Sequence, residues 1–141
     1  ADRKHGYLEA LRERGLPIRT ELIKCHHISF NSGLSDTHEL LQLPEPPDAI
    51  LAAHGLLATS ALLAVTDSGR LIPDEVSIVG YMSDWVSEMS HPRISFVKQN
   101  LKEIGIKAFR LLLDEIQGDD SVQRIVVNAR LELRDSTRKL L

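Results

Sequence analysis

The sequence predicts an α/β fold in which a parallel sheet lies between two layers of helices. Short, continuously apolar runs occur at residues 48–53 and 76–80. Runs of this kind are typical of parallel strands that are covered on both faces. Helical periodicity alternates with these runs and is clearest over residues 101–116, where apolar positions share one face. Alternating helices and buried strands predict a three-layer α/β/α parallel sheet with right-handed crossovers.

The first third of the chain contains two predicted helices with a strand between them. Residues 6–14 predict a helix that ends at Gly15. Residues 21–28 mix apolar and polar side chains and predict a strand. A short helix is expected over about residues 34–42, and the proline-rich residues 43–47 form a rigid connector.

The rest of the chain continues the alternation. A helix over about residues 56–67 is apolar nearly all round and should be deeply packed. A short strand is expected at residues 94–97, and residues 124–133 hold one or two more. Ligands of such sheets bind beyond the carboxyl ends of the strands. These ends are predicted near Ile28, His54 and Met82.

Composition limits the kind of protein. The chain has 141 residues with 17 basic and 20 acidic side chains, a net charge of −3, and no run of like charges. This balance argues against direct binding of DNA phosphates by this segment. The single cysteine, Cys25, excludes an intrachain disulfide and fits a reducing cytosol. The chain opens in a helical pattern without an initiator Met, and we interpret it as a fragment.

No catalytic or metal-binding pattern is found. Cys25, His26 and His27 are adjacent, and neighbouring residues of a strand point to opposite faces, so they do not chelate a metal together. A nucleophile-elbow motif, a phosphate-binding loop and a supported carboxylate pair are all missing from the sequence. We therefore expect neither an enzyme nor a bound metal or cofactor.

Five sequence blocks in chain order carry a more specific signal. They are Arg3-x-x-Gly6-Tyr7-x-x-Ala10-Leu11, Pro-Asp-Ala-Ile-Leu-Ala-Ala at 47–53, Ile-Pro-Asp-Glu-Val-Ser-Ile-Val-Gly-Tyr at 72–81, Pro92-x-Ile94-x-x-Val97-x-Gln99, and Leu-Glu-Leu-Arg-Asp-Ser-Thr at 131–137. Each block alone is weak, but together they resemble the effector-binding domain of the lactose-repressor/galactose-repressor (LacI/GalR) family of bacterial transcription regulators. The resemblance covers essentially the whole chain.

The resemblance implies the two-lobed periplasmic-binding-protein-like fold. Residues 1–98 would form most of the C-terminal lobe, residues from about 100 to 128 would belong to the N-terminal lobe, and residues 129–141 would return to the C-terminal lobe. The DNA-binding headpiece is not in this chain. In the family a small molecule, usually a sugar or a purine, binds between the lobes and shifts their orientation, and hence the grip of a homodimer on operator DNA.

The resemblance also implies two polar ligand contacts. Arg3 stands where the family carries an effector-contacting arginine, and its guanidinium suits a hydroxyl pair or a carboxylate. The alternative is a solvated Arg in a frayed first turn. His54 and Gly55 stand where the family usually has Asn-Asp. A neutral imidazole still donates and accepts, whereas Gly55 does neither. His54 without any ligand is the alternative.

Four further residues are candidate ligand contacts. Met82 stands where the family often has Asp, and a thioether lines an apolar sugar face rather than accepting hydrogen bonds. Asp84 is the candidate replacement acceptor. These departures count against a simple sugar as effector. Ile28 lies near the position of a stacking aromatic, although the nearby Phe30 fits a core role better. Gln99 lies at the implied hinge, where it bonds either to ligand or to backbone.

The expected dimer surface combines one face of the 56–67 helix with residues 84–91. Its members are Leu56, Thr59, Leu63, Trp85, Val86 and Met89. The leading hypothesis is thus a cytoplasmic transcription regulator that binds a sugar-like effector and operator DNA and no membrane. A secreted sugar-binding protein of a transporter shares the fold and is the alternative. The 72–80 and 134–137 blocks favour the regulator, and an upstream helix-turn-helix or signal peptide would discriminate the two.

Overall fold

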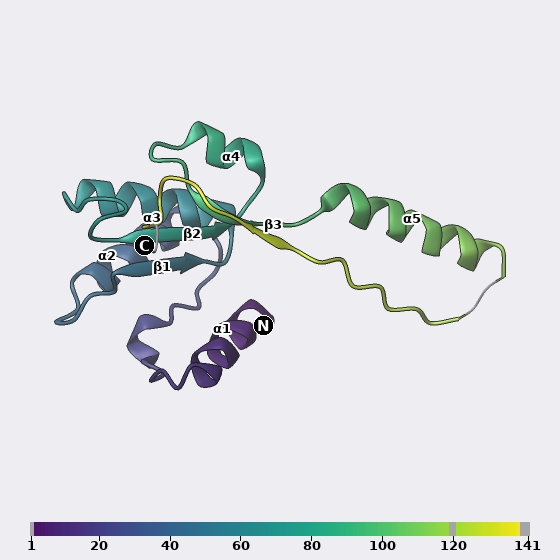
Figure 1. Ribbon diagram of the computed structural model, residues 1–141, viewed down its shortest axis with the longest axis horizontal. Coiled ribbons are helices and arrows are strands. Elements are labelled where there is room, and N and C mark those ends of the chain that lie inside the picture. The colour runs from purple at the N-terminus through teal and green to yellow at the C-terminus, as the bar shows by residue number, and fades with distance from the viewer. Residues whose placement is uncertain (1, 119–120, 139–141) are drawn as a thin grey trace.

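The computed structural model describes residues 2–118 and 121–138 and contains one four-stranded sheet (Figure 1). Three strands run parallel, in the order β1 (Ala49–Ala52), β2 (Ser77–Tyr81) and β3 (Ser95–Lys98). The last strand, β4 (Arg130–Glu132), pairs antiparallel with β3. The predicted α/β fold with a parallel sheet is confirmed, with one antiparallel strand added at its edge.

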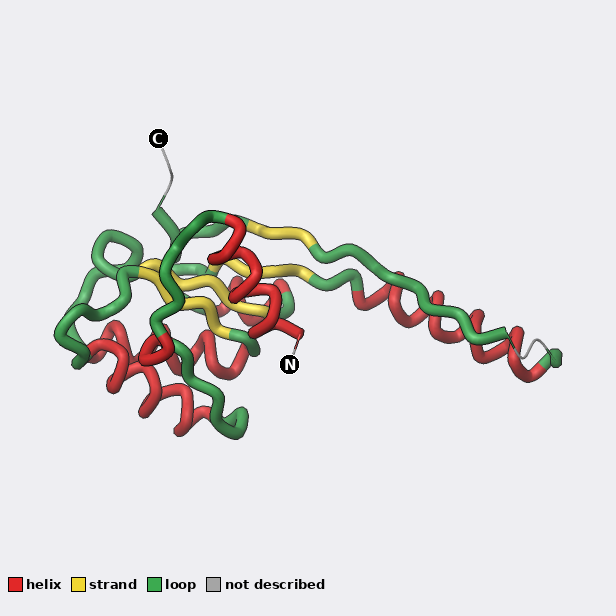
Figure 2. The backbone as a smooth tube through the Cα atoms, turned by 90° about the horizontal axis from the view of Figure 1, so that it is seen from below, coloured by secondary structure: helices red, strands yellow, loops and turns green. Residues whose placement is uncertain are grey.

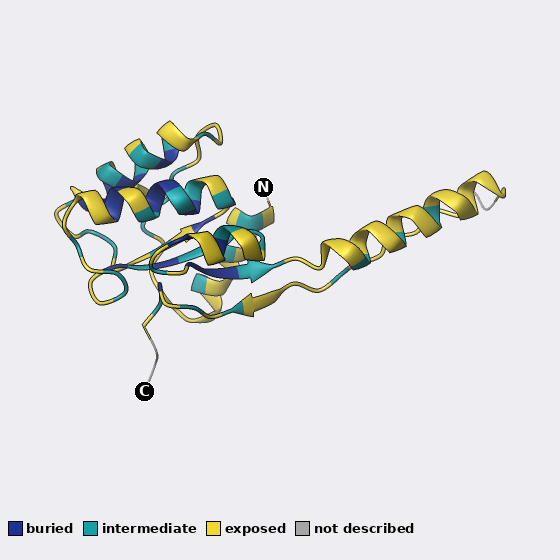
Figure 3. Cartoon of the chain, turned by 90° about the horizontal axis from the view of Figure 1, so that it is seen from above, coloured by how far each residue is buried: buried dark blue, intermediate teal, exposed yellow. Residues whose placement is uncertain are grey.

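The helices α2 (Phe30–Leu41) and α3 (Gly55–Asp67) lie together on one face of the sheet (Figures 2 and 3). Helix α3 packs on β1 and β2, and α2 packs along α3. The two helices approach closely at Gly33, where an added Cβ would lie 2.0 Å from Ser60 Oγ. The core between them and the sheet is fully buried, with Ala58, Val65, Val76, Ile78 and Ile94 at its centre.

The predicted strand at residues 21–28 is wrong. The structure has a short 3-10 helix, Thr20–Leu22, followed by irregular backbone up to Ser29. Side chains of this segment pair with α2 rather than with a strand: Lys24 Nζ lies 2.5 Å from Glu39, and His26 Nδ1 lies 2.6 Å from Asp36. The segment therefore adds no strand to the sheet, and β1 remains its edge.

Helix α2 also begins earlier than predicted. The hydroxyl of Ser29 accepts from the backbone N–H of Ser32 at 3.0 Å, and the Ser32 hydroxyl pairs with the Ser29 backbone N–H at 3.1 Å. This capping box stabilises a helix that starts at Phe30. Residues 31–33, which precede the predicted helix, lie in the first turn of α2. A further short helix, α4 (Asp84–Met89), beside β3, was not predicted.

Helix α5 (Leu101–Ile116) extends away from the sheet, and residues 121–129 run back toward it (Figure 1). The predicted bounds of α5 are confirmed, whereas the strand expected within residues 124–133 is limited to β4. None of the residues of α5 is buried, and Leu101, Phe109 and Ile116 expose 61%, 60% and 71% of their surface. We call residues 101–118 and 121–128 the arm.

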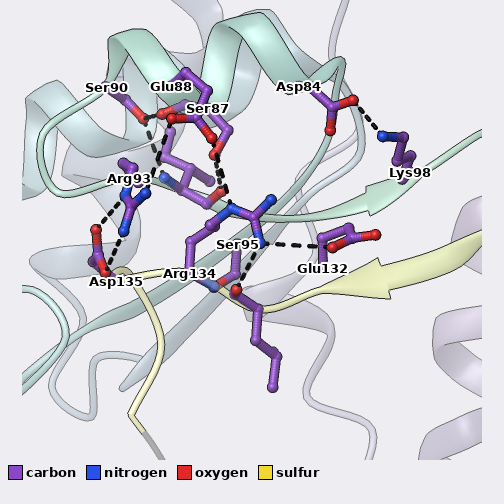
Figure 4. Close-up of polar contacts among 12 residues, drawn as sticks. Asp84, Ser87, Glu88, Ser90, Arg93, Ser95, Lys98, Glu132, Arg134 and Asp135 are labelled. Carbon is purple, nitrogen blue, oxygen red and sulfur yellow. Dashed lines mark hydrogen bonds and ion pairs between the residues drawn. The ribbon is translucent and has the colours of Figure 1, made fainter.

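The segment after β4 joins the amino ends of β2 and β3. Ser136 is fully buried; its hydroxyl donates to Ile78 O at 2.5 Å and accepts from Ser95 N at 2.8 Å. Ile78 N donates in turn to Ser136 O at 2.8 Å. Arg93 forms an ion pair with Asp135 at 2.8 Å, which holds the pKa of that carboxyl below its usual value (Figure 4). This segment therefore fixes the relation of two neighbouring parallel strands.

We predict that Ser136→Ala lowers the free energy of unfolding by about 1–3 kcal/mol, because it leaves Ser95 N and Ile78 O buried without their hydroxyl partner. Urea unfolding of the purified protein measures this. Ser35→Ala, which removes an exposed hydroxyl on α2, is the matched control and should change stability little. Equal stability of the two variants would contradict the role given to Ser136.

We predict a similar loss for Gly80→Ala. An added Cβ at Gly80 would lie 2.7 Å from Ala58 Cβ and 2.7 Å from Met82 Cε, so α3 must shift away from β2. Overpacking of this kind costs about 1–3 kcal/mol. The matched control is Gly105→Ala in α5, where an added Cβ meets nothing within 4 Å; it should leave the thermal midpoint unchanged or raise it. A drop for Gly105→Ala as large as that for Gly80→Ala would refute the packing argument.

Candidate ligand-binding site

The carboxyl ends of β1, β2 and β3 meet at one edge of the sheet, because the three strands are parallel and adjacent. The residues that follow these ends line a hollow of about 1190 Å³. We call it the strand-end pocket. Five of the six predicted ligand residues line it: Arg3, His54, Met82, Asp84 and Gln99. A smaller adjoining hollow of about 590 Å³ shares Arg3, Tyr81 and Gln99 with it.

Arg3 lies in the first turn of α1 (Asp2–Glu13) and is held against the sheet edge. Its guanidinium donates to Ala53 O, just beyond β1, and stacks over the ring of Tyr81, with Cζ 4.3 Å from the ring centroid. Both partners are uncharged. Among the described residues no carboxylate pairs with Arg3, so its positive charge faces the pocket uncompensated. Arg3 thus lies in a helical turn with its guanidinium at the sheet edge.

His54 caps the amino end of α3. Its Nδ1 accepts from Leu56 N at 3.2 Å, which in a neutral ring leaves the proton on Nε2 as a donor. Gly55 follows it, and a Cβ there would lie 3.2 Å from Met82 Cβ. Met82 itself packs partly against the core. This side of the pocket therefore offers a donor and an apolar surface, and no acceptor from positions 55 and 82.

Asp84, the first residue of α4, does not stand free. Lys98 Nζ, at the end of β3, donates to Asp84 Oδ2 (Figure 4). Lys98 was not singled out from the sequence, although it directly follows the strand predicted at residues 94–97 and thus lies where ligands of parallel sheets bind. Tyr81 was likewise not predicted as a pocket residue; it lines the pocket, and its ring lies beneath the guanidinium of Arg3.

Ile28 is not brought to the strand-end pocket. It lies in the irregular segment before α2, 48% exposed, and lines neither hollow. The sequence placed it at a strand end, and that strand does not form.

The predicted dimer residues lie on α3 and α4 beside the pocket. Leu56 and Leu63 are each 41% exposed, Trp85 is 66% and Met89 75% exposed, and Thr59 and Val86 are partly buried. Five of the six line the outer part of the strand-end pocket, Leu63 being the exception.

Within the described part of the chain, no three His, Cys, Asp or Glu side chains are grouped closely enough to hold a metal ion. Likewise, none of the described helices has both the length and the apolar character needed to span a bilayer.

Comparison with known proteins places the chain in a family. Residues 1–137 match the periplasmic binding protein-like domain. The probable HTH-type transcriptional repressor ExuR of Bacillus subtilis (strain 168) is 32% identical over 139 residues, which are 98% of this chain and 42% of ExuR.

Two solved structures are similar throughout. The transcriptional regulator CelR–cellobiose complex has a TM-score of 0.88 and 34% identity, covering 95% of this chain and 41% of that one. A putative transcriptional regulator LacI from Bacillus cereus subsp. cytotoxis NVH 391-98 has a TM-score of 0.91 and 29% identity, covering 99% of this chain and 50% of that one.

The chain thus spans between two fifths and half of the length of these proteins. Their names are those of transcriptional repressors and regulators, not of enzymes. The resemblance of the five sequence blocks is confirmed: the chain belongs to the periplasmic binding protein-like domain family, and its relatives are LacI-type transcription regulators.

Proposed function

We propose that this chain is the ligand-sensing part of a cytoplasmic LacI-type transcription regulator. A small molecule bound in the strand-end pocket controls DNA binding by a headpiece elsewhere in the longer protein. The observation that carries the proposal is the convergence of Arg3, His54 and Asp84 on one pocket from three different elements. Polar groups that converge on a concave site at the carboxyl edge of a parallel sheet are the usual arrangement of a binding site.

The ligand is a sugar or a sugar derivative. The structure of the relative CelR in complex with cellobiose supports this class. The pocket offers matching chemistry. Arg3 and His54 are donors that suit oxygen atoms, and Gln99 both donates and accepts. Met82 supplies apolar surface for the carbon face of a ring.

The arm belongs to the second lobe of the longer protein. Its apolar side chains are exposed along the whole of α5, and an apolar face of this extent is stable in water only when something covers it. Of the described residues, 2–98 and 129–138 form one lobe, and 100–118 and 121–128 pack into the other; the rest of the two predicted ranges lies outside the described residues. The crossings near residues 99 and 129 then act as hinges, and a ligand that binds the two lobe orientations unequally shifts their populations.

The full-length protein is a homodimer whose interface includes Leu56, Leu63, Trp85 and Met89. These exposed apolar side chains of α3 and α4 are typical of an interface core.

We predict that Met89→Asp shifts the full-length protein from dimer toward monomer in sedimentation equilibrium. Leu71→Asp, at an exposed apolar residue outside the proposed interface, is the control and should remain dimeric. A wild-type monomer at micromolar concentration would rule out the dimer.

We predict that Arg3→Ala weakens effector binding by about ten- to a hundred-fold, because it removes a charge-assisted hydrogen bond of roughly 1.5–3 kcal/mol. Operator affinity without effector should change little. The measurement is a titration of the full-length protein with the ligand that most stabilises the wild type in a screen of sugars and sugar derivatives, with operator binding in parallel at fixed salt.

Lys4→Ala is the matched control, since Lys4 is exposed in the same turn and lines neither hollow. It should bind effector like the wild type. Unchanged affinity of Arg3→Ala would remove Arg3 from the site, and a screen in which no ligand alters operator binding would contradict the sensing function itself.

A further inference from the structure

The strand-end pocket has a charge opposite to that of the chain. Although acidic residues outnumber basic ones, 20 to 17, the pocket is lined by four cationic side chains and a single carboxylate. The cations are Arg3, Lys98, Lys102 and Arg130, and the carboxylate is Asp84. They come from α1, β3, α5 and β4, so the excess does not follow from one basic stretch of sequence.

Two of the four cations have no acidic partner among the described residues. Lys98 is compensated by Asp84, and Arg130 by Glu132 at 2.7 Å. Arg3 contacts only a backbone carbonyl and an aromatic ring, and Lys102, in the first turn of α5, forms no ion pair with the described residues. The adjoining hollow adds one carboxylate, Asp2. A positive charge therefore remains on the pocket wall.

Two acceptors that would bind the hydroxyl groups of a neutral polyol already accept hydrogen bonds within the protein. Asp84 already accepts from Lys98, and Nδ1 of His54 already accepts from Leu56 N. Gly55 and Met82, which abut at the mouth of β1 and β2, offer no acceptor. Gln99 and Asn128 both donate and accept, and among the described lining residues the charged groups without an opposite charge are the donors Arg3 and Lys102.

We propose that the effector is an anion: a small molecule that carries a carboxylate or a phosphate, such as a sugar acid or a sugar phosphate. The guanidinium of Arg3, ordered on Tyr81, binds the anionic group, because its planar array of donors matches two oxygens of a carboxylate or phosphate. Lys102 adds a second, flexible positive charge. This inference rests on the proposed sensing function and specifies its ligand.

The test uses the full-length protein and matched pairs of neutral and anionic compounds: glucose against glucuronate and glucose 6-phosphate, and galactose against galacturonate, with cellobiose as a further neutral probe. Binding is measured by thermal shift and by isothermal titration. We expect an anionic compound to bind at least about ten-fold more tightly than its neutral partner, with an affinity that falls as salt is raised.

Charge-removing variants locate the effect. Arg3→Gln and Lys102→Gln should each weaken the anionic compound by roughly ten-fold and leave any binding of its neutral partner nearly unchanged. Lys4→Gln and Arg110→Gln remove a charge from the same two helices outside both hollows and should bind like the wild type. Because Lys102 is exposed, its substitution leaves the fold intact.

Three outcomes overturn the proposal. If a neutral sugar binds as tightly as its charged partner and Arg3→Gln weakens both equally, the sensing function stands and the anionic class is wrong. If the anion binds but Lys4→Gln and Arg110→Gln weaken it as much as the pocket variants do, the attraction is general and not that of the pocket. If no compound binds and none alters operator affinity, both the anionic class and the sensing function fail.

Discussion

The hydrogen bonds of the buried Ser136 with Ile78 and Ser95 hold two neighbouring parallel strands together, and the geometry of the pocket follows from the placement of those strands. They tie the amino ends of β2 and β3 to a segment that is some forty to sixty residues away along the chain. Parallel strands separated by long crossovers have no hairpin to fix their register. With the amino ends joined, the opposite ends of β2 and β3 meet at one edge, where Met82, which follows β2, and Lys98, the last residue of β3, line the same pocket.

Close packing of α3 on the sheet positions the amino end of this helix at the pocket. Gly80 leaves no room for a side chain between β2 and Ala58, so α3 lies directly on the strand. The amino end of α3 is therefore fixed beside the end of β2, and His54, which caps it, is fixed with it. Arg3 reaches the same edge from α1 through Ala53 O and the Tyr81 ring. The pocket thus follows from the parallel direction of the strands, from the packing of Ala58 on Gly80, and from the contacts of Arg3 with Ala53 O and the Tyr81 ring.

Local patterns were sufficient for part of this structure. The strands β1 and β2 and the amphipathic helix α5 were predicted closely. The two strands are uninterrupted apolar runs with clear boundaries, and α5 has one clear helical period. The segment at residues 21–28 was not, since its mixture of apolar and polar residues suits a strand, whereas Lys24 and His26 pair with α2. Tertiary pairing decided that case. Similarly, Asp84 was identified from the sequence as a free acceptor, but its partner Lys98 comes from β3, and only the fold brings the two together.

We propose that the effector binds at the carboxyl edge of β1–β3, in the strand-end pocket. The most direct measurement is hydrogen–deuterium exchange of the full-length protein, with and without the ligand that binds best in the paired screen. We predict that backbone amides of residues 53–56, 81–85 and 98–102 exchange more slowly when ligand is bound, because these segments line the strand-end pocket. Unchanged exchange in all three segments, with protection confined to other parts of the protein, would contradict it.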